Sequence, residues 1–149
     1  MSIELQTPAK SRILIADDSG MNRMMLSELL EDRYDILEAS NGAEALSVIH
    51  QNLSSLDLVL LDIVMPEMDG FGVLAHMKKR RWLEFIPVIM ISSEGDSSYI
   101  ERALNLGASD YIQRPYKSFL IHRRIMNTLA LFQRQRRLVG LVEEQVYEN

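Results

Sequence analysis

Cysteine is absent from this 149-residue chain, and so are long apolar runs. Without cysteine the chain has no disulfide and no thiolate metal site, and a reducing compartment is permitted although not proved. The apolar run nearest the N-terminus, residues 13–16, is too short for a signal peptide. No stretch approaches the roughly 20 apolar residues of a membrane span. We therefore expect a cytoplasmic protein with no membrane partner.

An excess of positive charge is lacking as well. The chain has 16 Lys and Arg against 21 Asp and Glu, a net charge of −5. Nucleic-acid binding needs clustered Lys and Arg, so no direct nucleic-acid partner is expected. The exception is the segment 117–149, where six basic residues face three acidic ones. We interpret this cluster as a solvated helix face, with contact to nucleic acid or membrane as the less favoured alternative.

Short apolar runs alternate with amphipathic stretches five times, and the length fits one domain. The predicted strands are residues 13–16, 34–39, 56–62, 87–91 and 111–112. The predicted helices begin after Ser19 and Asn41, occupy 71–80 and 96–106, and extend from Ser118 almost to the end. Near-continuous apolar strands between amphipathic helices predict an α/β fold of five βα units. We expect a doubly wound, flavodoxin-like, five-stranded parallel sheet.

Charged and hydroxyl side chains stand where the predicted strands end. Asp17 and Asp18 follow the first strand, Asp62 ends the third, Ser92 follows the fourth and Arg114 follows the fifth. Each of these is ordinary by itself, as a helix cap, a turn residue or a surface charge. Ligands of doubly wound sheets bind outside the carboxyl ends of the strands. The coincidence of all five at that edge therefore predicts a functional site.

This residue set favours phosphoryl chemistry assisted by a metal. Three carboxylates held together repel one another, and a hard dication with oxygen ligands, Mg²⁺, relieves that repulsion. Asp62 can act as a nucleophile and form an acyl phosphate. Ser92 could donate a hydrogen bond to the new phosphoryl group, and Arg114 could neutralise its charge.

Four segments carry a resemblance to a known family. They are Ile-Leu-Ile-Ala-Asp-Asp-Ser at 13–19, Leu-Leu-Asp-Ile-Val-Met-Pro-Glu-Met-Asp-Gly at 60–70, Pro-Val-Ile-Met-Ile-Ser-Ser at 87–93 and Gly-Ala-Ser-Asp-Tyr-Ile-Gln-Arg-Pro-Tyr at 107–116. Together they resemble the receiver domain of two-component response regulators. The resemblance covers about residues 11 to 130, and its most specific part surrounds Asp62.

The resemblance implies a role for each site residue. Asp62 would accept a phosphoryl group from a histidine kinase, a phosphotransfer protein or a small phosphodonor. Asp18 and Asp62 would bind Mg²⁺ directly, Asp17 would act mainly through water, and the backbone carbonyl of Val64 would complete the metal site. The chain would then be a regulatory domain that catalyses only its own phosphorylation and dephosphorylation.

The resemblance also implies how the signal would spread. Ser92 stands at the family's switch hydroxyl and Tyr111 at its switch aromatic. When Ser92 moves toward the phosphoryl group, Tyr111 would rotate inward and reshape the face formed by the fourth helix, the fifth strand and the fifth helix. The alternative for Tyr111 is a half-buried strand aromatic.

Arg114 departs from the family pattern, which has a nearly universal Lys there. Arginine is planar and forked, so the exchange is not conservative at a phosphate site. It supports one alternative, a pseudo-receiver that works by interaction or dimerisation without phosphorylation. A second alternative is a phosphatase resembling the haloacid dehalogenase class. That class has a second Asp two residues after its nucleophile, where this chain has Val64.

The C-terminal helical pattern continues past residue 130, so we divide the chain into a receiver, 11–130, and a helical extension, 131–149. Two heptad positions can be assigned along it, with two polar residues in the second, and Gly140 weakens the pattern. The first position holds Ile125, Phe132, Val139 and Val146, and the second holds Ile121, Thr128, Gln135 and Val142. This pattern predicts a homodimeric coiled coil leading to an output domain beyond Asn149; the alternative is one amphipathic helix packed partly on its own domain. The amino-acid sequence of this segment is similar to the corresponding segment of receivers that precede cyclic-di-GMP enzymes. The methionines of the first helix, Met21, Met24 and Met25, are predicted to fill the core.

Overall fold

The computed structural model describes residues 10–93 and 97–148, with side chains up to Arg134. Strands and helices alternate along the described chain. The strands are β1 (Arg12–Ala16), β2 (Asp35–Ala39), β3 (Leu58–Asp62), β4 (Val88–Ser92) and β5 (Asp110–Gln113). The helices are α1 (Gly20–Leu30), α2 (Gly42–Gln51), α3 (Gly70–Lys79), α4 (Ser97–Asn105) and α5 (Ser118–Glu148), with a short 3₁₀ turn at Trp82–Glu84.

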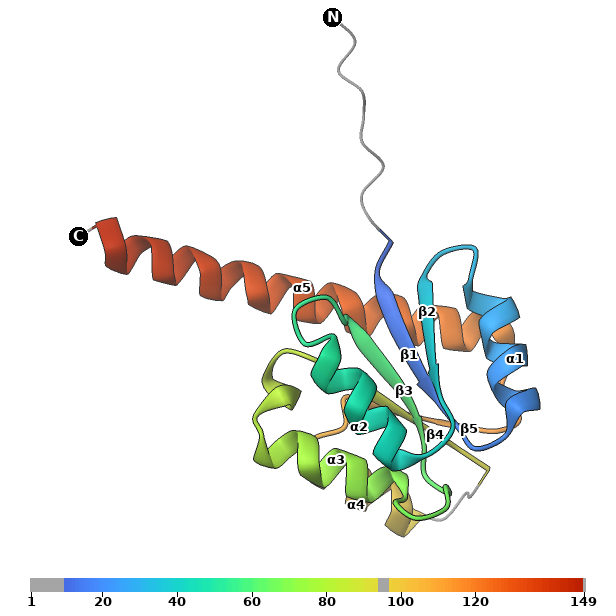
Figure 1. Cartoon of the computed structure of the whole chain (residues 1–149). Helices are drawn as coiled ribbons and strands as arrows, with labels where there is room; N and C mark the ends of the chain where they lie inside the picture. The colour runs from blue at the N-terminus through green and yellow to red at the C-terminus, as the bar shows by residue number, and fades with distance from the viewer. Residues whose placement is uncertain (1–9, 94–96, 149) are drawn as a thin grey trace, which may run out of the picture.

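The five strands form one parallel sheet in the order β2-β1-β3-β4-β5 (Figure 1). The strand order reverses direction between β1 and β3, which makes the carboxyl ends of these two strands the switch point of the sheet. The predicted fold class is confirmed.

Helices cover both faces of the sheet. Alternate residues of each strand point to opposite sides, and apolar residues on both sides are buried against helices. Leu14 and Val59 lie in one buried cluster with residues of α2, α3 and α4. Ile13 and Leu58 lie in the other, with residues of α1 and α5. Strands β3 and β4 are buried at every position, which explains their unbroken apolar runs.

Several predicted boundaries shift by one or two residues. The second strand begins at Asp35, the third at Leu58 and the fourth at Val88. The fourth helix begins at Ser97, and the predicted start at Asp96 lies outside the described residues. The predicted helix stop at Gly107 fits a backbone φ of +108°, a conformation that glycine adopts readily.

The methionines of α1 do not fill the core as predicted. Met21, Met24 and Met25 are 69%, 54% and 58% exposed, whereas Leu26 and Leu30 are buried against the sheet. The helix carries two neighbouring apolar stripes, and residues 26 and 30, one helical turn apart, face the sheet. The methionine stripe is thus left on the surface.

Helix α5 is one continuous helix that extends beyond the sheet (Figure 1). Ile121, Ile125 and Leu129 are buried in the cluster shared with α1. Thr128, one of the polar residues in the predicted heptads, is also buried. The first turns of the predicted coiled-coil seam therefore pack on the chain's own sheet. The later seam residues, from Gln135 on, lie outside the described side chains.

Candidate functional site

Three carboxylates meet at the switch point of the sheet. Asp17 and Asp18 follow β1 directly, and Asp62 is the last residue of β3. One oxygen from each lies within 4.8 Å of the others, with Asp17 and Asp62 buried and Asp18 exposed. The predicted gathering of these residues is what the structure shows, and the exposed Asp18 leaves the cluster open to solvent.

Both carboxylate oxygens and the backbone carbonyl of Asp17 accept hydrogen bonds. Its Oδ1 accepts a hydrogen bond of 2.9 Å from the Ser19 backbone N–H, and its Oδ2 accepts one of 2.5 Å from Arg114. Its backbone carbonyl accepts a hydrogen bond of 2.7 Å from Arg23. Ser19 also caps α1, accepting from the Asn22 N–H. The cap that starts the helix thus also orients the carboxylate.

The Asp62 carboxyl is only 7% exposed. Burial and the neighbouring Asp17 carboxylate raise its pKa to about 6, while the Arg114 guanidinium opposes the rise. Burial first, and the Asp17 charge second, therefore disfavour the ionised form of this carboxyl. That is the setting in which a further cation, or a proton, binds favourably.

Gly70 lets the loop after β3 approach Asp62 closely. A Cβ at Gly70 would collide with the Asp62 backbone oxygen and lie 2.9 Å from the Ile63 Cα. The Gly70 N–H donates a 2.7 Å hydrogen bond to the Ile63 carbonyl. Asp69 caps α3 by accepting from the Gly72 N–H at 2.8 Å. The Asp-Gly pair therefore fixes the loop against the site by a cap and a close contact.

Arg114 reaches into the carboxylate cluster from the end of β5. One guanidinium nitrogen lies 2.5 Å from Asp17 Oδ2, and the other lies 3.5 Å from Asp62 Oδ1. Its backbone N–H donates a 2.8 Å hydrogen bond to the Ser92 carbonyl. The Arg114–Pro115 peptide bond is cis. Arg114 therefore contacts the predicted acceptor directly.

The remaining predicted residues occupy the surroundings of the cluster. Ser92 ends β4, next to β3 in the sheet, and is 1% exposed. Tyr111 is 8% exposed and lies in the buried cluster that also contains residues of α2, α3 and α4. Val64, in the loop after β3, has an exposed side chain.

Arg23 was not predicted from the sequence. It bonds the Asp17 carbonyl and, at 3.2 Å, Glu38 of β2, so it ties the ends of β1 and β2 together. A basic residue near the start of α1 opposes the helix dipole, which is a signal that it has a specific acidic partner.

The donor set suits a hard, oxygen-binding dication. Carboxylate oxygens from three residues converge, and one of those residues is solvent-accessible. Mg²⁺ prefers such ligands and keeps several waters, for which the exposed side of Asp18 leaves access. The residues present therefore fit Mg²⁺.

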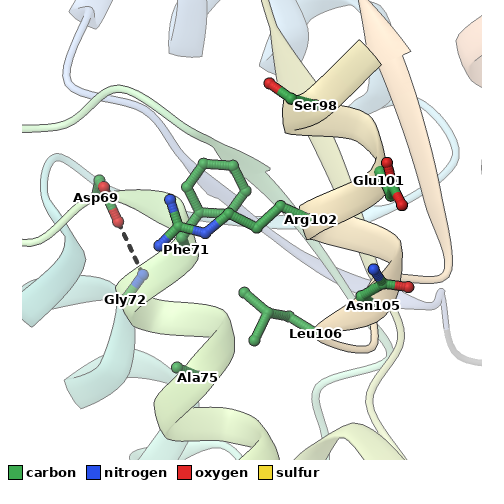
Figure 2. A pocket seen from close by; sticks show the side chains of 9 residues that line it. All are labelled: Asp69, Phe71, Gly72, Ala75, Ser98, Glu101, Arg102, Asn105 and Leu106. Atoms are coloured by element: carbon green, nitrogen blue, oxygen red, sulfur yellow. Dashed lines mark hydrogen bonds between the residues drawn. The ribbon is translucent and has the colours of Figure 1, made fainter. Parts of the chain in front are cut away.

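Hollows on the surface of the described chain include one of about 580 Å³, which is lined by Arg114, Pro115 and Tyr116 together with Met25 and Leu29 of α1. Another, of about 560 Å³, lies between α3 and α4 (Figure 2). There the Arg102 guanidinium lies 4.2 Å from the centre of the Phe71 ring. None of the predicted site residues lines the second hollow.

Comparison with known proteins identifies the family. The family profile described as "Response regulator receiver domain" matches residues 13–126. A probable transcriptional regulator ycf27 from Guillardia theta is 36% identical over 130 residues, covering 87% of this chain and 48% of that protein. A probable cyclic di-GMP phosphodiesterase from Vibrio cholerae is 36% identical over 123 residues, covering 83% of this chain and 27% of that protein.

A solved structure shows the same fold. A chain in the crystal structure of the CheX–CheY–BeF3–Mg²⁺ complex from Borrelia burgdorferi matches with a TM-score of 0.74 and 30% identity. The match covers 80% of this chain and 89% of that one. The chain spans less than half the length of the two curated relatives named above. In the part of the chain that the structure describes, no helix combines the length and apolar character needed to cross a membrane.

Proposed function

The chain belongs to the response regulator receiver family, and from that premise we propose that Asp62 accepts a phosphoryl group, with Mg²⁺ bound beside it. Membership makes the chain a regulatory domain of phosphorylation-based signalling. The observation that carries the residue assignment is the convergence of Asp17, Asp18 and Asp62 within 4.8 Å at the switch point of the sheet. The Borrelia structure, which holds Mg²⁺ and BeF3 in its complex, supports the same chemistry.

Asp18 and Asp62 are the proposed direct ligands of Mg²⁺, and the backbone carbonyl of Val64 completes the protein's share. Asp17 acts through water, and this is supported by its Oδ1, which is already bonded to the Ser19 N–H. When bound, Mg²⁺ supplies positive charge that offsets the charge of the carboxylates and of the incoming phosphoryl group.

In the proposed reaction an Asp62 carboxylate oxygen attacks the phosphorus of the donor. The new P–O bond makes an acyl phosphate, and the P–N bond of a phosphohistidine or the P–O bond of acetyl phosphate breaks. The bonding electrons leave with the histidine or the acetate. Ser92 then donates a hydrogen bond to a phosphoryl oxygen, and Arg114 offsets its charge.

The signal is proposed to pass from Ser92 to Tyr111. Ser92 ends β4, and Tyr111 of the neighbouring strand β5 pairs with Met90 of β4. A change at Ser92 would alter the packing of Tyr111, and with it the face formed by α4, β5 and α5. The proposed change is an inward rotation of Tyr111 that follows the movement of Ser92 toward the phosphoryl group.

A partner that donates phosphate, a histidine kinase or phosphotransfer protein, is proposed to dock on α1. Met21, Met24 and Met25 are exposed there, and Met25 borders the hollow that also contacts Arg114. Flexible methionines suit an adaptable helical interface. The docking face would then adjoin the acceptor.

The pseudo-receiver alternative is favoured by one observation: Arg114 pairs with both Asp17 and the acceptor Asp62. In that alternative the ion pairs are structural, and the chain acts by interaction only. The phosphatase alternative has no comparable support, since Val64 supplies no acid or base where that class has its second Asp.

Intact-protein mass after incubation with acetyl phosphate and Mg²⁺ tests the proposal. We expect one added phosphoryl group in the native chain and none in Asp62→Asn or in the presence of a chelator. Asp69→Asn is the matched control, because Asp69 is an exposed helix cap in the same motif and Asn caps well. No addition to the native chain, with acetyl phosphate or with a range of histidine kinases, would favour the pseudo-receiver.

The helical extension, 131–149, is proposed to join two receivers and to lead toward an output domain beyond Asn149. The length of the relatives and the continuous helix α5 support this arrangement. The V. cholerae relative supports an output in cyclic-di-GMP metabolism. The cytoplasmic location stays a prediction.

A further inference from the structure

We propose that Arg114 is a built-in counter-ion that competes with Mg²⁺ for Asp17 and Asp62, and so sets the Mg²⁺ concentration at which the domain is ready for phosphorylation. This inference rests on the metal site proposed above. It concerns the one site residue at which the sequence departs from the family pattern.

The forked shape of arginine is what permits the contact. One guanidinium nitrogen is 2.5 Å from Asp17 Oδ2, and the other is 3.5 Å from Asp62 Oδ1. A lysine ammonium is a single point of charge on a shorter stem, whereas the planar guanidinium offers separate N–H groups to two acids. Both contacts are largely shielded from water, because the side chains of Arg114, Asp17 and Asp62 are 18%, 2% and 9% exposed.

These contacts occupy oxygens that a metal site needs. Asp17 Oδ1 is bonded to the Ser19 N–H and Oδ2 to Arg114, so each oxygen of this carboxylate already has a donor. Asp62 Oδ1 faces the same guanidinium. A dication or its bound water at these oxygens would meet a positive charge at short range. Arg114 must therefore withdraw, at least from Asp17, when Mg²⁺ binds.

The surroundings give the side chain somewhere to go without moving the backbone. The Arg114 backbone is fixed to β4 by its 2.8 Å hydrogen bond to the Ser92 carbonyl. Its side chain borders the hollow of about 580 Å³ lined also by Pro115 and Tyr116. In the proposal, a guanidinium released from Asp17 keeps its reach toward Asp62, from which it now lies 3.5 Å, and can meet a phosphoryl group there. Arg114 thus changes partner from Asp17 to the phosphoryl group.

The test measures Mg²⁺ affinity by titration calorimetry, and the melting temperature with chelator and with saturating Mg²⁺. The proteins are the native full chain, Arg114→Lys and Arg114→Gln. Arg124→Lys is the control, since Arg124 makes a similar ion pair with Asp110 at the opposite end of β5. In the native chain, Mg²⁺ binding must break the charge-assisted hydrogen bond between Arg114 and Asp17, whereas Arg114→Lys lacks that bond. We therefore expect Arg114→Lys to bind Mg²⁺ on the order of tenfold more tightly than the native chain.

We expect Arg114→Lys to melt below the native chain in chelator, and the difference to shrink in saturating Mg²⁺, while Arg124→Lys keeps native Mg²⁺ affinity. Equal Mg²⁺ affinity in the native chain and Arg114→Lys would overturn the proposal. If only Arg114→Gln then bound Mg²⁺ more tightly than the native chain, the positive charge at position 114 would weaken Mg²⁺ binding, and the two-pronged guanidinium contact would not matter. If the role of Arg114 were purely structural, Arg114→Lys would lower the melting temperature by the same amount in chelator and in saturating Mg²⁺.

Failure of this inference is distinct from failure of the proposed function. If the variants bind Mg²⁺ alike and the native chain still gains a phosphoryl group at Asp62, only the competition is wrong. If the native chain and every variant fail to bind Mg²⁺, the metal site and the competition are both wrong.

Discussion

At the scale of single residues, Asp62 makes the metal-free protein sensitive to pH. Its pKa is raised from 3.8 to about 6 by burial and by Asp17. A raised carboxyl pKa stabilises the fold below the unfolded value, and that stability is lost as pH rises toward 6. In chelator, we expect Asp62→Asn to stabilise the protein, and its advantage over the native chain to grow by about 2 kcal/mol between pH 4.5 and 7.5.

Urea denaturation at the two pH values measures this difference. Saturating Mg²⁺ is the control condition, because a bound dication favours the charged carboxylate and should remove the advantage of the variant at pH 7.5. A stability difference that does not change with pH would mean that Asp62 is not the carboxyl responsible.

Gly70 also affects the position of Asp62, because only a residue without a side chain fits against the backbone there. We expect Gly70→Ala to lower the free energy of unfolding by about 1 to 3 kcal/mol, because the new Cβ would collide with the backbone at Asp62. Phosphorylation by acetyl phosphate should slow as well. Gly20→Ala is the control, since its Cβ has no neighbour closer than 3.6 Å. Equal stability of the two variants would contradict the role given to Gly70.

Sequence reasoning succeeded for residues whose place follows from topology. Asp17, Asp18 and Asp62 had to meet once the first and third strands were parallel and adjacent, because the carboxyl ends of such strands share one edge. It did not find that Arg114 would pair with Asp17 as well as approach Asp62. That contact depends on side-chain reach and on competition between partners, which spacing along the chain does not encode. Arg23 was missed for the same reason.

At the scale of elements, the strands and helices were predictable because their signals are local. Ser19 and Asn41 cap α1 and α2 where the sequence predicted helix starts, and Gly107 follows the end of α4. The methionines of α1 were assigned to the wrong side. Helical spacing identifies apolar stripes, but when a helix has two, only the packed sheet decides which stripe is buried.

The exposed stripe of α1 predicts a defect specific to protein partners. We expect the double variant Met24→Ser, Met25→Ser to lower kcat/KM for phosphotransfer from the cognate histidine donor by about tenfold, since apolar contacts at interface centres dominate affinity. Phosphorylation by acetyl phosphate should be unchanged, because that donor needs no docking face.

Initial rates of radiolabel transfer would measure this effect. Leu104→Ser, at an exposed position on α4 across the sheet, is the matched control. If that variant slows transfer as much as the α1 variant does, the donor docks elsewhere.

At the scale of the whole molecule, α5 is predicted to belong to two regions, the receiver and the helical extension. Among its described side chains, which end at Arg134, the last buried one is Leu129, whereas the helix continues to Glu148. We expect a chain ending at residue 131 to keep the receiver folded, with a melting temperature within a few degrees of the native one. Ile125→Ala, in the packed part, should cost about 2 to 5 kcal/mol.

Circular dichroism on heating and light scattering after size exclusion would check this. If the extension makes the dimer, the native chain should have twice the monomer mass and the shortened chain the monomer mass. A shortened chain that unfolds would show that the extension is part of the receiver. A monomeric native chain would leave the extension without the proposed dimer role.

The continuity of α5 also has a mechanical meaning. From Leu129 to Glu148 the helix advances 19 residues, about 28 Å at the usual rise of 1.5 Å per residue. A stiff rod rooted beside β5 is a lever: a tilt of about 10° at its root sweeps its tip through roughly 5 Å. A small tilt of α5 where it packs on the sheet would therefore displace the C-terminal end of the helix by a distance comparable to one helical turn.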